Sequence, residues 1–136
     1  MTRREAIDPL KVREAAERYA EAWTSGSPAA VAACYTPDGQ ITINRGETLR
    51  GRAAIADMAA GFHAAFPGLA VLCDEVRTAG DHVLFAWTLK GRHVDTGNDV
   101  CIVGWEEWEL DEDCRIRTSL GWFDVDEYER QIAGGG

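Results

Sequence analysis

Glu106 has the type and setting of an acid–base residue. Between about 99 and 110 every second residue shares a face, on which Glu106 is the one ionisable member beside Val100, Ile102, Gly104, Trp108 and Leu110. Side chains two residues apart on a strand point to the same side. A carboxyl group among apolar neighbours is desolvated, so its pKa rises and it can exchange protons near neutral pH. A register slip of one residue would instead expose Glu106.

Asp124 is a second candidate for proton transfer. It follows the alternating face of Ile116, Thr118, Leu120 and Trp122, which would bring its carboxylate to the rim of an apolar pocket. The alternative is structural, because Asp124 followed by Glu127 has the spacing of a helix N-cap with a capping-box partner.

Tyr19 and His93 complete the predicted catalytic set. Tyr19 lies on the apolar stripe of a helix predicted from about 8 to 24, where a buried phenol needs a hydrogen-bond partner such as a ligand carbonyl. Packing alone would also explain this tyrosine. His93 continues the face of Trp87 and Leu89 and would act as a proton shuttle, or stand exposed at a strand end.

Aromatic residues are numerous enough to line a pocket for a small apolar or aromatic ligand. We expect six of them to contact it: Trp23, Phe62, Phe66, Trp87, Trp108 and Trp122. Trp105 has the opposite alternation from Trp108. It is therefore predicted on the outer face of the sheet, where an exposed indole indicates a covered surface.

Composition narrows the function classes. The 136 residues fit one domain, 1–136, with an ordered core of about 8–132 and a flexible glycine-rich C-terminal tail. A formal charge of −9 disfavours nucleic acid and anionic membranes as partners. No run approaches the roughly 18 apolar residues of a membrane span, and residues 1–8 show no secretory signal, so we expect a cytoplasmic protein. With no metal-ligand cluster and no nucleotide fingerprint, no metal or organic cofactor is expected.

The order of periodic segments predicts an α+β fold. Helical spacing marks about 8–24, 27–34 and 51–66, and strand patterns mark 40–44, 70–78, 82–92, 99–110 and 114–123, with a last short helix from Asp124. Helices grouped before a meander favour a cone-shaped, strongly curved antiparallel sheet wrapped around three N-terminal helices. The unfilled end of such a cone makes a pocket.

Several local phrases occur in this order of elements. They are Glu17-Arg-Tyr-Ala-Glu-Ala-Trp, Tyr35-Thr-Pro-Asp-Gly, Leu49-Arg-Gly-Arg-Ala-Ala-Ile, Gly80-Asp-His-Val, Trp87-Thr-Leu-Lys-Gly-Arg-His and Trp108-Glu-Leu-Asp-Glu-Asp-Cys-Arg-Ile. Over about residues 10–130 the chain resembles the SnoaL-like polyketide cyclases of the nuclear transport factor 2-like superfamily, which also holds ketosteroid isomerases. The resemblance implies a cystatin-like roll and a homodimer formed through the sheet.

The same resemblance implies roles for single residues. Tyr19 stands where ketosteroid isomerases carry an oxyanion-hole tyrosine, and Glu106 is similar to their strand acid. Asp124 is similar to the late aspartate of SnoaL-like cyclases. The chain departs from the isomerases at Ile43-Asn44-Arg45, where they place the proton-transferring aspartate. Steroid isomerisation is therefore disfavoured, as is epoxide hydrolysis, because the Arg-x-Asp strand pair is not found.

Three functions remain open. The first is a cofactor-independent acid–base enzyme, a cyclase, isomerase or dehydratase, acting on a hydrophobic carbonyl compound. The second is a non-catalytic ligand-binding or accessory protein with the same pocket. The third is a protein–protein adaptor whose cone is filled by side chains. Fold alone does not choose among them.

Overall fold

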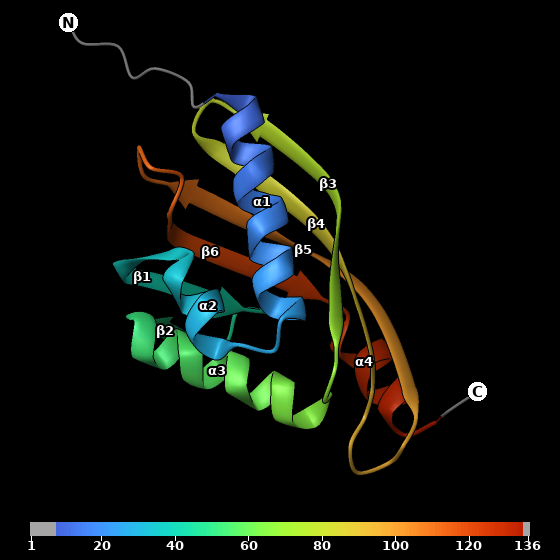
Figure 1. The fold of residues 1–136 in the computed structure, drawn as a ribbon. Helices are drawn as coiled ribbons and strands as arrows, with labels where there is room; N and C mark the ends of the chain where they lie inside the picture. Colours follow the sequence, from blue (N-terminus) through green and yellow to red (C-terminus); the bar gives the residue numbers. More distant parts are fainter. Residues whose placement is uncertain (1–7, 135–136) are drawn as a thin grey trace, which may run out of the picture.

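A computed structural model describes residues 8–134 and has an α+β architecture (Figure 1). The predicted tail residues 135 and 136 lie outside this range. Four helices and six strands follow one another in the order α1 (Pro9–Thr24), α2 (Pro28–Ala33), β1 (Tyr35–Ile43), β2 (Thr48–Arg50), α3 (Arg52–Ala65), β3 (Ala70–Ala79), β4 (His82–Arg92), β5 (Asp99–Leu110), β6 (Ile116–Phe123) and α4 (Val125–Ile132).

The N-terminal helices begin at local sequence signals. Asp8 accepts a hydrogen bond from the Leu10 N–H and precedes Pro9 in the first turn of α1. Ser27 caps α2 in the same way and precedes Pro28. A side-chain acceptor satisfies a free N–H of the first turn, and proline costs nothing there. These signals fix where α1 and α2 start, and so where the apolar face of α1 lies.

The sheet is curved and open, with strand order β2-β1-β6-β5-β4-β3. The helices α1, α2 and α3 lie along its concave side (Figure 1). One neighbouring pair, β1 and β6, is parallel, and all other pairs are antiparallel. The curved antiparallel sheet expected from sequence is confirmed except at this one pair, which is parallel because the chain crosses from β2 through α3 before it forms the meander β3 to β6.

The two central strands of the sheet, β6 and β5, differ in regularity. In β5 buried and exposed residues alternate over all twelve positions. In β6 the pairing with β5 shifts between Glu109 and Leu110, which face Thr118 and Ile116. A residue inserted in a ladder moves all later side chains to the opposite face.

The shift in β6 corrects the predicted inner face of that strand. Ile116 is buried as expected, but beyond the bulge the buried positions are Ser119 and Gly121. Leu120 is 44% exposed. Trp122 pairs with Trp105, so its side chain lies on the outer face of the sheet.

Candidate active site

Glu106 lies on the inner face of β5, where its alternation predicts it. Its register partners are Phe85 on β4 and Gly121 on β6. Only 7% of its surface is exposed. Because neither neighbour brings a cation, burial is not offset by an opposite charge, and desolvation raises the pKa of the Glu106 carboxyl.

Four hydrogen bonds hold the two carboxyl oxygens of Glu106 differently. Oε1 accepts from Trp108 Nε1 at 2.9 Å and from Ser119 Oγ at 2.7 Å. The Tyr19 hydroxyl donates across both oxygens at 3.2 Å. Within residues 8–134, Oε2 has no other partner. These bonds favour the ionised form and partly oppose the effect of burial, and they leave Oε2 as the oxygen that can exchange a proton.

Tyr35 extends this network behind Tyr19. The two hydroxyl oxygens lie 2.9 Å apart, and both side chains are buried. When the Tyr19 O–H donates to Glu106, the Tyr35 O–H can donate to Tyr19. Burial, with Glu106 nearby, raises the pKa of both phenols well above the ordinary value, so both stay protonated donors.

Sequence reasoning missed Tyr35 and Ser119 as members of the network. In the sequence Tyr35 stands out only as the first residue of the phrase Tyr35-Thr-Pro-Asp-Gly, and no local pattern pairs it with Tyr19. An unbroken alternation along β6 would place Ser119 on the outer face, but the bulge brings it to the inner face.

An apolar cavity of about 60 Å³ opens beside Glu106, which is the only carboxylate among its lining residues. Ligand pockets usually measure roughly 300–1,000 Å³, so this one is narrow. The lining residues are Tyr19, Trp23, Ile41, Ile43, Met58, Phe62, Val71, Phe85, Trp87, Leu89, Ile102, Glu106, Gly121, Trp122, Phe123 and Tyr128.

The six aromatic residues predicted to contact a ligand divide into two groups. Four of them, Trp23, Phe62, Trp87 and Trp122, line the cavity. Phe66 and Trp108 do not, and their prediction is corrected: Phe66 packs beneath Gly91, and Trp108 turns its N–H to Glu106.

Trp122 is the sixth of these residues. It borders the cavity, but its indole stacks on Trp105 and donates to Glu107 on the outer face. The β6 bulge turns the Trp122 side chain toward this outer face.

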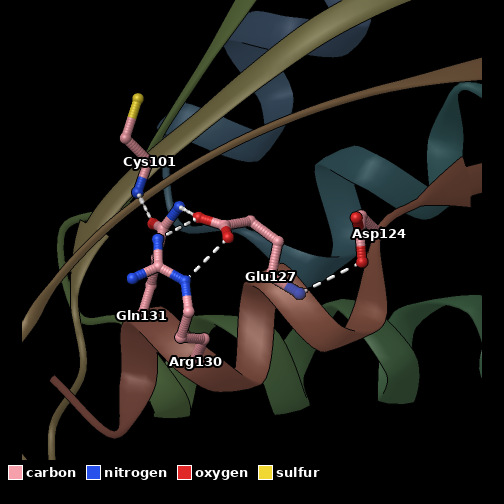
Figure 2. A network of polar contacts seen from close by, with 5 residues as sticks. All are labelled: Cys101, Asp124, Glu127, Arg130 and Gln131. Carbon is pink, nitrogen blue, oxygen red and sulfur yellow. Dashed lines mark hydrogen bonds and ion pairs between the residues drawn. The ribbon is translucent and has the colours of Figure 1, made fainter. Parts of the chain in front are cut away.

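Asp124 does not face the cavity, and this prediction is wrong. Its exposed carboxylate accepts the Glu127 N–H at 3.1 Å as the N-cap of α4 (Figure 2). Arg130 and Gln131 bind the Glu127 side chain and lower the pKa of that carboxyl to about 2. Gln131 also accepts the backbone N–H of Cys101 at 2.7 Å, which ties α4 to β5. Asp124 therefore anchors a helix end.

Replacing the cap tests this assignment. We expect Asp124→Ala to lower the free energy of unfolding by about 1 kcal/mol, because the first turn of α4 loses its acceptor. Asp124→Asn keeps a capping oxygen and should stay near wild-type stability. Urea unfolding followed by circular dichroism measures both. Loss of turnover in both variants with stability unchanged would restore the catalytic role.

His93 also lies away from the cavity, contrary to prediction. Its ring packs on Phe66 at 5.4 Å between centroids, and Nδ1 lies 3.2 Å from the Thr96 hydroxyl. It belongs to the turn after β4, where the chain leaves the strand and its alternation no longer applies. A local turn contact replaces the predicted proton shuttle.

The segment at Ile43-Asn44-Arg45 brings no acid to the site. Asn44 and Arg45 have positive φ angles of 50° and 61° and form the turn after β1. Asn44 Oδ1 accepts the Phe123 N–H at 2.9 Å, and the Arg45 guanidinium lies over Trp122. Both side chains thus hold the turn against β6. The site has one carboxylate where a two-carboxylate mechanism needs two.

Residues 8–134 contain no group of three or more His, Cys, Asp or Glu side chains placed to hold a metal ion. None of their helices is long and apolar enough to cross a membrane.

Residues 16–118 match the SnoaL-like domain. The chain belongs to this family. A steroid Δ-isomerase of Nocardioides simplex is 35% identical to the SnoaL-like chain over 96 residues, which cover 68% of the chain and 72% of that relative. The family assignment and the superfamily predicted from sequence are therefore confirmed.

Solved structures confirm the fold of this SnoaL-like chain. A hypothetical protein with a ketosteroid isomerase-like fold from Catenulispora acidiphila, in complex with trimethylamine, has a TM-score of 0.80 and 21% identity, covering 92% of this chain and 93% of that one. An LEH-like epoxide hydrolase of M. tuberculosis has a TM-score of 0.74 and 20% identity, covering 93% and 92%. At such identities the likeness concerns the fold alone.

Proposed function

We propose that this SnoaL-like chain is a cytoplasmic, cofactor-independent acid–base enzyme acting on a small hydrophobic carbonyl compound. The observation that carries the proposal is Glu106: one buried carboxylate, bound by phenol, indole and hydroxyl donors, beside an apolar cavity. Perturbed carboxyl groups in apolar clefts are typical of proton-transfer sites.

The geometry supports a single proton-transfer step. Glu106 Oε2 takes a proton from the carbon next to the ligand carbonyl, and the C–H electron pair moves to give an enolate. Tyr19 donates a hydrogen bond to the carbonyl oxygen as negative charge develops there, while Tyr35 donates to Tyr19. With a β,γ-unsaturated ketone, return of the proton from Glu106 to the γ-carbon completes an isomerisation. If the enolate instead attacks a second carbonyl, a ring forms and Glu106 gives its proton to the resulting alkoxide.

The size of the cavity limits the class of substrate that it can bind. The Nocardioides relative is named for a steroid, but a steroid is larger than a cavity of about 60 Å³ accommodates unless the aromatic walls move. The absence of a second carboxylate among the lining residues also separates this site from a two-carboxylate isomerase. One-ring and two-ring ketones, which need a smaller movement of the walls than a steroid does, are therefore the substrates that we propose.

Deuterium uptake tests the proposal directly. The protein is mixed in D₂O with enolisable ketones such as cyclohexanone and 2-tetralone, and loss of the α-proton signal is followed by NMR. We expect exchange faster than in buffer and saturable in ketone. Saturable binding without faster exchange would support the alternative of a non-catalytic ligand-binding protein. That alternative is favoured by the three donors on Oε1, which also suit a purely structural carboxylate.

We also propose a homodimer formed through the outer face of the sheet. Val103 is 67% exposed, Trp105 42% and Leu120 44%, on adjacent strands β5 and β6. Exposed apolar clusters of this kind mark interaction sites. Light scattering at micromolar concentration should give twice the chain mass of 14.9 kDa, and a monomer mass would contradict the dimer.

A further inference from the structure

Trp87 carries a buried donor that the fold does not satisfy. Among the residues described, 8–134, the buried side-chain polar atoms without a hydrogen-bond partner are Trp87 Nε1 and His63 Nδ1. Of the two residues, only Trp87 lines the cavity. Leaving a buried N–H without an acceptor is costly, so such a group in a cavity wall points to an acceptor supplied from outside the chain.

Gly104 explains why the indole can occupy this place. It is the register partner of Trp87 on β5. A Cβ at residue 104 would lie 2.4 Å from Cζ2 of Trp87 and 2.6 Å from Cη2. Cζ2 belongs to the same edge of the ring as Nε1, so this edge lies over a backbone position that bears no side chain. Gly121 on β6, the register partner of Glu106, likewise lines the cavity without a side chain.

Tyr128 brings a second donor to the same end of the cavity. It projects from α4 and lines the cavity, and its hydroxyl has no hydrogen bond to any residue in the described range. Phe123 lies between the two side chains, with ring centroids 6.1 Å from Trp87 and 5.3 Å from Tyr128. The rings of Trp87 and Tyr128 thus flank one aromatic ring beside α4.

This end is separated from Glu106 by an apolar interval. Trp87 faces Gly104, two residues before Glu106 on the same side of β5. Two residues of a strand span about 7 Å. Leu89, Ile102 and Ile43 supply the surrounding walls. The cavity therefore has an apolar middle with polar groups on either side of it.

We infer that the cavity contains a second polar subsite, formed by Trp87 Nε1 and the Tyr128 hydroxyl, which binds a second acceptor oxygen of the ligand. The inference rests on the proposed function, in which the first oxygen is the carbonyl next to Glu106 and Tyr19. The substrate class is then a cyclic ketone that bears another carbonyl or ether oxygen across the ring. Trp87 selects this class over ketones with one oxygen.

Cyclohexane-1,4-dione and cyclohexanone, which differ by one oxygen, are the probes. Dissociation constants come from chemical-shift titration of the Met58 and Ile102 methyl groups, which line the cavity. We expect the wild-type protein to bind the dione at least about fivefold more tightly, as one net hydrogen bond gives. Because the dione has two equivalent carbonyl groups, statistics alone would make it bind about twofold more tightly than cyclohexanone. Trp87→Phe should bring the ratio to about two or below, with cyclohexanone affinity within about twofold of wild type.

Two further variants sharpen the result. Tyr128→Phe should lower the dione preference in the same direction, and Trp105→Phe, the same exchange on the outer face, should leave it unchanged. An equal preference in wild type and Trp87→Phe would overturn the subsite, and so would failure of the dione to bind the wild-type protein. Dione-selective binding without α-proton exchange would leave the subsite standing and reject only the catalytic proposal.

Discussion

Glu106→Gln is expected to slow α-proton exchange of a bound ketone by about 10²- to 10⁴-fold, the usual contribution of a positioned general base. Glutamine keeps the shape of the side chain and an oxygen that can accept from Trp108, Ser119 and Tyr19. It cannot take the proton on the second terminal atom. Ketone affinity should therefore change little while exchange is lost, and NMR exchange and titration experiments measure the two separately.

The same substitution should change how stability depends on pH. Burial raises the pKa of Glu106 in the folded protein above its value in the unfolded chain. A carboxyl group with a raised folded pKa contributes stability that is fully present below the unfolded pKa of about 4.5 and is lost as the pH rises through the folded pKa. The variant has no such group. Its free energy of unfolding relative to wild type should thus increase from pH 4 to pH 8, by about 1.4 kcal/mol for each unit of raised pKa.

Glu109→Gln is the matched control, since Glu109 lies on the same strand but is exposed on the outer face. It should leave both exchange and the pH dependence of unfolding near wild type. Urea unfolding at several pH values gives the comparison. If Glu106→Gln and Glu109→Gln behave alike in both measurements, Glu106 is neither the base nor a buried titrating group.

The success of the sequence analysis at Glu106 has a physical cause. Strand β5 has neighbours on both sides and alternates without interruption, so parity alone identifies its inner face. The apolar stripe of α1 identified Tyr19 in the same way, because a helix repeats its face every three to four residues. Both predictions used periods that are local to one element.

The failures at Asp124 and His93, and the wrong strand face predicted for Trp122, share the opposite cause. Each was extrapolated along a strand past a point where the period ends or slips: the β6 bulge for Trp122, the start of α4 for Asp124 and the turn after β4 for His93. A bulge is decided by pairing with another strand. The contact of Tyr19 with Tyr35 is likewise set by the packing of α1 against the sheet, which no local pattern encodes.

Tyr19→Phe is the second substitution with a large expected effect. The change removes one hydroxyl and keeps the ring packed against Trp23, Phe85 and Trp108. If Tyr19 donates to the developing enolate oxygen, exchange should fall by about 10²- to 10³-fold, as when one oxyanion-hole donor is removed. The loss should appear in the turnover rate more than in ketone affinity.

The pH profile of exchange should shift in the same variant, and the direction identifies the role of Tyr19. Its hydrogen bond favours ionised Glu106, so removing it raises the pKa of Glu106 further. Because the base acts in its ionised form, exchange rises with pH through this pKa, and the midpoint should move to higher pH in Tyr19→Phe. Tyr35→Phe removes a hydroxyl that acts on Glu106 through its neighbours Tyr19 and Ser119 and does not line the cavity, so its loss should stay below about tenfold with a smaller shift. Equal losses in the two variants with an unmoved midpoint would mean that Tyr19 acts through packing alone.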